Sequence, residues 1–228
     1  LADVSAERLE FRPVAGLPLV NVERPTAAKS LRWVKRSMDV LGSAFFLLMT
    51  SHILLAAMIA IKLEDGGPIF FKQRRVGLNG EEFDCLKLRS MCVDAEARLA
   101  ELQAKNEGTG YLFKMKDDPR ITRVGKIIRR FSVDELPQLW NVFRGDMSLV
   151  GPRPALPKEV AQYDFDTRRR LRVRPGLTGL WQVSGRSRLS AEDSQRLDLY
   201  YVDNWSMMQD LMILAKTAKA VVGSSGAY

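Results

Sequence analysis

Two adjacent carboxylates, Asp134 and Glu135, form the part of the chain best suited to chemistry. A basic pair, Arg129 and Arg130, precedes them, and Pro137 follows. Neighbouring side chains on a helix point in different directions, so both acids can act on one ligand only at a turn or a helix start. Pro137 indicates such a start, because proline lacks a backbone donor and suits the first helical turn.

Two kinds of role suit this pair of acids. The free amides and the dipole of a helix start favour negative charge, so we expect Asp134 to stay ionised and able to attack an electrophile. An aspartate can carry a phosphoryl group, Glu135 can hold Mg²⁺ against substrate phosphates, and Arg129 or Arg130 would neutralise charge. The alternative is structural, because Ser132 and Glu135 have the spacing of a capping box.

The residues that follow favour the catalytic interpretation. From Asp134 to Pro154 the chain reads DELPQLWNVFRGDMSLVGPRP. This long stretch resembles the bacterial sugar transferase family, the phosphoglycosyl transferases that act on polyprenyl phosphate. The resemblance extends from the Lys35-Arg36-Ser37-Met38-Asp39 segment to about Thr217. It implies that Asp134 attacks the β-phosphate of a UDP-sugar and releases UMP. Polyprenyl phosphate would then take the sugar phosphate from Asp134.

The resemblance also implies a cellular setting. A polyprenyl (undecaprenyl) diphosphate sugar would start the assembly of an extracellular polysaccharide or O-antigen glycan. The chemistry would take place on the cytoplasmic face of the bacterial inner membrane, with the lipid bilayer as a third partner and Mg²⁺ as cofactor. A hexose is favoured, because longer family members often use glucose or galactose. The sequence does not identify the sugar, the nucleotide base or the oligomeric state, and a homodimer is left open.

Other residues are candidates for substrate contacts. The two prolines of the Gly151-Pro-Arg-Pro154 loop fix its backbone, which would present Arg153 as a phosphate clamp. Lys87 and Arg89 match the family's Lys-aromatic-Arg element, with leucine in place of the aromatic residue, and are also expected to bind phosphate. Candidates for nucleotide or sugar contacts are Gln138, Asn141, Trp181, Gln182 and Arg186.

Composition narrows the choice of partner. The 228 residues carry a net charge of +8 and a pI near 9.7, which suits an anionic partner. No RNA-binding signature or zinc finger is recognisable, so we expect no nucleic-acid partner. Two cysteines are too few for a disulfide framework, and one histidine without a Cys/His cluster argues against a zinc site.

An uncharged run from Val40 to Ile61 is long enough, as a helix, to cross the ~30 Å hydrocarbon layer. Basic residues flank both ends, so the positive-inside rule gives no orientation. The polar residues Thr50, Ser51 and His52 lie at mid-depth, where they need partners. We therefore expect a helix that enters, bends and returns, as the family resemblance also implies. His52 replaces the proline usual at this bend, and Ser51 bonding back to a carbonyl would bend the helix instead.

These features predict a mainly helical α+β fold. Residues 1–30 would be the remnant of a preceding domain and a linker, 31–63 the membrane-inserted helix, and 64–228 the cytoplasmic transferase domain. We expect a β-hairpin of residues 69–72 and 83–89, turning at 77–80, and helices over 94–106 and 117–130.

Two other functions remain to be distinguished. A non-enzymatic basic membrane-binding module would explain the apolar run and the charge, but it assigns no purpose to Asp134, Glu135 or the Arg153 loop. An aspartyl-phosphate hydrolase would use the same nucleophile and need no lipid acceptor.

Overall fold

A computed structural model describes residues 9–14, 17–22, 29–102, 118–185 and 189–222. The described part is mainly helical, with three separate two-stranded sheets, so the expected α+β class is confirmed. The first sheet is an antiparallel hairpin of β1 (Leu9–Val14) and β2 (Leu17–Val22). The assignment of residues 1–30 to a preceding domain stays a prediction.

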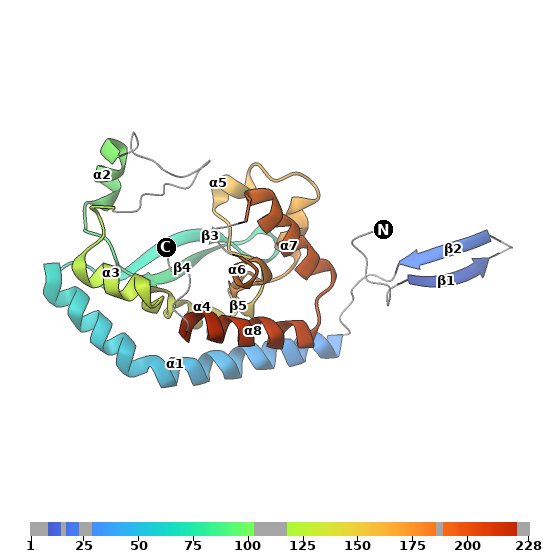
Figure 1. Ribbon diagram of the computed structural model, residues 1–228, viewed down its shortest axis with the longest axis horizontal. Helices are drawn as coiled ribbons and strands as arrows, with labels where there is room; N and C mark the ends of the chain where they lie inside the picture. Colours follow the sequence, from blue (N-terminus) through green and yellow to red (C-terminus); the bar gives the residue numbers. More distant parts are fainter. Residues whose placement is uncertain (1–8, 15–16, 23–28, 103–117, 186–188, 223–228) are drawn as a thin grey trace.

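The long helix α1 (Lys29–Asp65) contains the whole apolar run. It continues through His52 without a break, yet it changes direction part-way along its length (Figure 1). The Thr50 hydroxyl donates to the Phe46 carbonyl at 2.7 Å, and the Ser51 hydroxyl to the Leu48 carbonyl at 2.8 Å. Such back-bonding bends helices, so the expected bend needs no proline and no interruption. Re-entry into a membrane stays a prediction.

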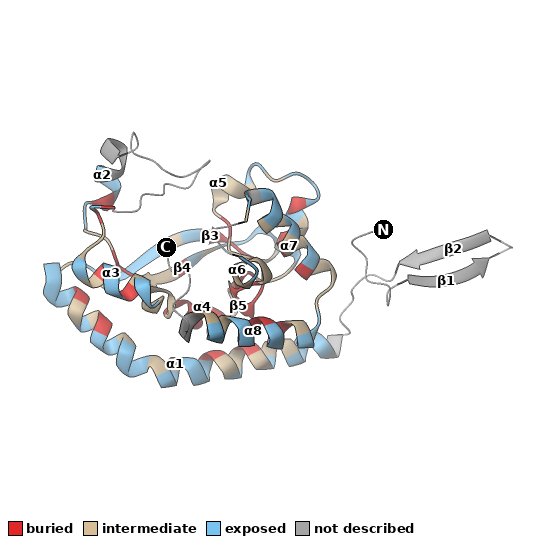
Figure 2. Cartoon of the chain, viewed as in Figure 1, coloured by how far each residue is buried: buried red, intermediate tan, exposed pale blue. Residues whose placement is uncertain are grey.

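Only a narrow stripe of α1 packs on the rest of the molecule. Asp39, Ser43, Ala57 and Ile61 are buried, whereas most of the helix surface is open (Figure 2). Leu48, for example, is 75% exposed. Over residues 31–65, the helix is long and apolar enough to cross a membrane, and only 11% of its most apolar window is buried. A core helix of a soluble protein would be mostly buried, so this exposed apolar surface suggests membrane association.

The second sheet is an antiparallel hairpin of β3 (Phe70–Val76) and β4 (Glu82–Leu88), as predicted. The short helix η2 (Leu78–Gly80) makes the turn, where Asn79 and Gly80 both have left-handed backbone angles. Directly opposed and alternate residues share one face of a hairpin. The register therefore places Gln73, Arg75, Cys85 and Lys87 on the same face.

Short helices and one small parallel sheet complete the fold. The helix α2 (Ala95–Leu102) begins where expected, and the predicted end at 106 lies outside the described residues. The predicted start at 117 of the next helix is wrong. There Asp118 and Arg120 form a buried ion pair, and α3 (Arg123–Arg130) begins only after Thr122, whose hydroxyl accepts from the Gly125 amide at 2.9 Å.

The remaining elements follow in order. They are η4 (Val133–Glu135), α4 (Gln138–Arg144), β5 (Ser148–Val150), α5 (Pro157–Val160), η5 (Thr167–Arg172), β6 (Gly176–Thr178), α6 (Leu180–Val183), α7 (Ala191–Asp203) and α8 (Met207–Val222). The strands β5 and β6 pair in parallel.

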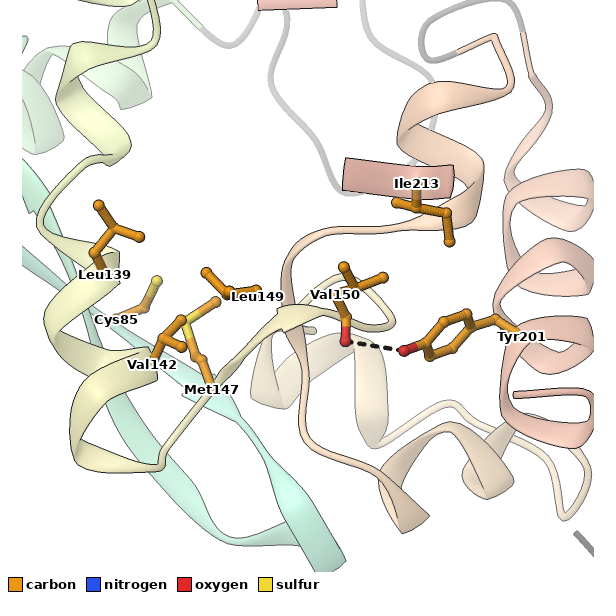
Figure 3. Packing of buried hydrophobic residues seen from close by; sticks show 8 residues of the cluster. All are labelled: Cys85, Leu139, Val142, Met147, Leu149, Val150, Tyr201 and Ile213. Atoms are coloured by element: carbon orange, nitrogen blue, oxygen red, sulfur yellow. Dashed lines mark hydrogen bonds between the residues drawn. The ribbon is translucent and has the colours of Figure 1, made fainter. Parts of the chain in front are cut away.

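Two hydrophobic clusters hold these elements together. The larger joins the hairpin, α4, β5, α7 and α8, and Figure 3 shows its eight buried residues: Cys85, Leu139, Val142, Met147, Leu149, Val150, Tyr201 and Ile213. The smaller joins α1 to β4 and α3 through Ala57, Ile61, Leu88 and Ile128. Between them, these clusters fix the elements on both sides of η4.

Candidate active site

The two carboxylates lie in η4, a single tight turn between α3 and α4. Ser132 enters this turn with a left-handed backbone (φ 54°), and the Leu136 amide donates to the Val133 carbonyl at 3.2 Å. Pro137 then precedes α4, which confirms the expected helix start. The Ser132 side chain makes no capping hydrogen bond, so the capping-box alternative is wrong.

Glu135 is held by a cation from the hairpin. The Lys87 ammonium lies 2.7 Å from Glu135 Oε1, although the two residues are 48 positions apart in the chain. Both side chains are partly exposed, so the pair remains open to a ligand. The contact brings together two residues that the sequence analysis assigned separately, one as a metal ligand and the other as a phosphate-binding residue.

Asp134 is half-buried, and its pKa is raised to about 6. Burial is the main cause and the neighbouring Glu135 carboxylate adds to it, while Lys87 and Arg129 act in the opposite direction. The helix start was expected to favour the ionised form, but desolvation exceeds the favourable contacts and raises the pKa instead. At neutral pH the carboxylate remains mostly ionised, but it is a stronger base than an exposed aspartate.

Arg129 and Arg130 have different surroundings. The Arg129 guanidinium donates to the Ser90 hydroxyl at 2.8 Å. Its positive charge favours the ionised form of Asp134. Arg130 is exposed and lies over the Phe131 ring, 5.7 Å from its centroid. Of the two, Arg129 is the better placed to act beside Asp134.

Arg153 extends from the loop between β5 and α5. Its guanidinium lies 3.3 Å from Glu159 Oε2 and is partly exposed. Arg75, which is buried and donates to the Pro154 carbonyl at 2.8 Å, interacts electrostatically with both Arg153 and Glu135. Because Arg75 links the loop to the acidic turn, it belongs to the site. Nothing in the sequence marked Arg75 as part of the site, because its contact with the Pro154 carbonyl joins residues 79 positions apart.

Two residues that were predicted to contact substrate, Arg89 and Asn141, form hydrogen bonds to other parts of the protein. The Arg89 guanidinium binds Asp65 at the end of α1 and the Pro68 carbonyl, the latter at 2.5 Å. The Asn141 amide group accepts from the Leu86 amide at 3.0 Å and donates to the Asp84 carbonyl at 2.9 Å. These contacts fix α1 and α4 to β4. The predicted substrate contacts of both residues stay untested.

The remaining candidates are placed but have no tested role. Gln138 is buried at the start of α4, and Trp181 and Gln182 are half-buried in α6. Arg186 lies outside the described residues. The structure thus gathers Lys87, Arg129, Asp134, Glu135 and Arg153 with Arg75 into one electrostatically coupled region.

Comparison with known proteins identifies the family. The model of the family described as "Bacterial sugar transferase" matches residues 30–224, which is most of the chain. The chain belongs to the bacterial sugar transferase family. The resemblance seen in the catalytic stretch is therefore confirmed, and the chain is an enzyme rather than a membrane-binding module.

Several sugar transferases are similar over long stretches. The exopolysaccharide production protein ExoY of Sinorhizobium fredii is 46% identical over 85% of this chain and 88% of its own length. The undecaprenyl-phosphate galactose phosphotransferase of Salmonella typhimurium is 42% identical over 92% of this chain, which spans 45% of that protein. A UDP-glucose:undecaprenyl-phosphate glucose-1-phosphate transferase of Caulobacter vibrioides is 39% identical over 98% of this chain and 79% of its own length.

Proposed function

We propose that the chain transfers a hexose 1-phosphate from a UDP-hexose to polyprenyl phosphate through a covalent intermediate on Asp134. A carboxylate oxygen of Asp134 attacks the β-phosphorus, and the bond from that phosphorus to the bridging oxygen breaks, so that UMP leaves with the electron pair. A phosphate oxygen of the lipid then attacks the same phosphorus and frees the carboxylate. The observation that carries this proposal is a half-buried carboxylate of raised pKa beside a second carboxylate, flanked by cations.

The main barrier to this attack is repulsion between the anionic nucleophile and the anionic diphosphate. The cations around η4 would reduce this repulsion. The charges of Arg129 and Lys87 favour the ionised form of Asp134, and Lys87 also contacts Glu135 at 2.7 Å. Positioned cations stabilise the charge on a transferring phosphoryl group. Arg153, fixed by its loop, would orient the diphosphate.

Glu135 is the residue proposed to hold Mg²⁺. A magnesium site commonly has one or two carboxylates, with substrate phosphates and water completing the shell. Glu135 offers such a carboxylate, since its side chain is 40% exposed beside Asp134. When bound, the ion neutralises charge on the diphosphate. The Lys87 ammonium already contacts Glu135 Oε1 at 2.7 Å, so an ion bound here would have to share this carboxylate with Lys87 or displace it.

The choice of lipid acceptor and sugar rests on the relatives. Those from Salmonella and Caulobacter are named for undecaprenyl phosphate, with galactose and glucose as their respective sugars. Both ends of α1 contact the same folded domain: Asp39 accepts from the Leu149 amide, and Glu64 accepts from the Arg123 amide. This arrangement supports a helix that enters the bilayer from the cytoplasmic face and returns to it. The site would then lie at the level of the lipid phosphate.

A single-turnover experiment tests the covalent mechanism. With UDP-glucose or UDP-galactose and no lipid, the enzyme should release up to one UMP per chain and gain the mass of a hexose phosphate. Asp134→Asn should abolish both signals, whereas the matched surface variant Asp84→Asn should retain them, because Asp84 is exposed on β4. UMP release only in the presence of lipid would exclude the two-step route. Free hexose phosphate without lipid would instead support an aspartyl-phosphate hydrolase.

The metal assignment is tested in the same assay. Glu135→Gln and chelator treatment should each suppress UMP release while thermal unfolding stays close to that of the unmodified protein. Undiminished release in chelator would remove Mg²⁺ from the proposal without affecting the role of Asp134.

A further inference from the structure

Two charged residues of the membrane helix extend into the domain beneath it. Asp39 is buried, and its Oδ1 accepts from the Leu149 amide and from the Ser148 hydroxyl, each at 3.0 Å. Lys35, one turn earlier, lies 3.2 Å from Asp39 Oδ1 and donates to the Val150 carbonyl at 3.3 Å. Together they contact every residue of β5.

A second acid completes this buried network from the other side. Asp210, at the start of α8, lies 2.7 Å from the Lys35 ammonium and accepts from the Tyr201 hydroxyl at 2.7 Å. Tyr201 also approaches the Val150 carbonyl oxygen at 3.0 Å (Figure 3). The side chain of Asp210 is fully buried, and that of Lys35 is only 16% exposed. The basic flank of α1 is thus an internal structural element as well as a membrane-side charge.

The strand held by this network leads directly to Arg153. Gly151 follows β5, and its amide donates to the Thr178 carbonyl at 2.9 Å. A Cβ at this glycine would lie 2.5 Å from the Arg174 carbonyl oxygen, so the two backbone segments approach each other more closely than any other residue would allow. At the far end of the loop, the Val76 amide donates to the Ala155 carbonyl at 2.9 Å. The backbone that presents Arg153 is therefore fixed at both ends, one of them set by α1.

The composition of the network argues for a role in orientation. Burying charged groups costs free energy even when they are paired, and apolar side chains of similar size often give equal or greater stability. Directional hydrogen bonds to the amide and carbonyl groups of β5, in contrast, specify its position along α1. A small displacement of a substrate-positioning group can lower an enzymatic rate by ~10²-fold.

We propose that Lys35 and Asp39 are positioning residues, through which the membrane helix sets the Arg153 loop for the substrate diphosphate. This inference rests on the proposed function, in which Arg153 orients that diphosphate. It predicts that the active site is assembled only when the first turns of α1 are seated on β5.

Hydrogen exchange tests the structural part independently of activity. Asp39→Ala should increase amide exchange across residues 149–155, whereas Asp39→Asn should restore most of the protection, because its amide oxygen can still accept from Leu149. Thr217→Val is the matched control: it removes the 2.8 Å contact with Thr178 on the neighbouring strand and none of the contacts to β5. Unchanged exchange in Asp39→Ala, or an equal increase in Thr217→Val, would overturn the proposal.

A double-mutant cycle tests the link to Arg153. Asp39→Ala and Arg153→Ala should each lower kcat/KM by about tenfold or more, and the double variant should lose little beyond Arg153→Ala, because both changes remove the same contact. Losses that multiply would contradict a role through Arg153. If the unmodified enzyme fails to form the hexose-phosphate adduct, the proposed mechanism fails, while hydrogen exchange still decides whether α1 fixes the loop.

Discussion

The carboxyl group of Asp134 is subject to opposing influences. Burial and the Glu135 charge favour its protonated form, whereas Lys87 and Arg129 favour its ionised form. The balance leaves its pKa at about 6. A carboxylate of this kind is ionised near neutral pH without being strongly stabilised as an anion, which would suit the proposed attack on phosphorus. Because the pKa is higher in the folded chain than in the unfolded chain, keeping Asp134 ionised costs folding free energy.

A pH series measures that cost. Between pH 4 and pH 6 the folded chain keeps a proton on Asp134 that the unfolded chain has lost, so this residue lowers stability as pH rises. Asp134→Asn should therefore raise the free energy of unfolding at pH 8, by up to ~3 kcal/mol, and change it little at pH 4. Chemical denaturation without substrate or Mg²⁺ checks this, and UMP release should fall as pH drops through 6. A gain over the unmodified protein that is no larger at pH 8 than at pH 4 would contradict the raised pKa.

At the scale of elements, α1 combines an exposed apolar surface with charged anchors at both ends. Arg36 donates to the Val142 carbonyl near one end, and Asp65 binds Arg89 at the other. Trp33 is 74% exposed and Leu63 81% exposed, so these two residues lie near the ends without taking part in the anchoring. Since the domain contacts both ends, it would have to lie on both sides of a bilayer if α1 spanned it.

Cysteine labelling at the exposed ends tests the topology. Trp33→Cys and Leu63→Cys, in a Cys92→Ser background, should both react with a membrane-impermeant reagent from the same side of sealed vesicles. His52→Pro should keep activity, because Thr50 and Ser51 already accompany a bend there. Labelling from opposite sides would show that α1 spans the membrane.

At the scale of the whole molecule, α1 is part of the domain core and not a detachable anchor. Ile61 is 2% exposed and packs with Leu88 and Ile128, and Val133 of η4 packs against the same cluster. The helix α1 and the turn η4 thus share one hydrophobic cluster. Any change that loosens this cluster should affect both.

A matched pair of substitutions measures this integration. Ile61→Ala should destabilise the domain by ~2–4 kcal/mol, because it leaves a cavity in the cluster. Leu63→Ala, two positions later on the open surface, should change the unfolding free energy by less than ~0.5 kcal/mol. Denaturation in detergent micelles distinguishes the two. Equal effects would show that α1 packs on the domain differently from the arrangement described.

The sequence alone determined the features that depend on local chemistry. Pro137 predicted the turn at Asp134, and the glycines at 77 and 80 predicted the turn of the hairpin. The uncharged run predicted the long helix. The residues from Asp134 to Pro154 also identified the family, because that stretch is long and specific.

Only the tertiary structure decided which charged groups form ion pairs and how far each of them is buried. Lys87 binds Glu135, Arg89 binds Asp65 and Lys35 binds Asp210, and each pair is separated by many residues. From sequence alone, neither the protein partners of Arg89 and Lys35 nor the raised pKa of Asp134 could be foreseen. A pKa depends on desolvation and on neighbours brought together by folding, and neither is a local property of the chain.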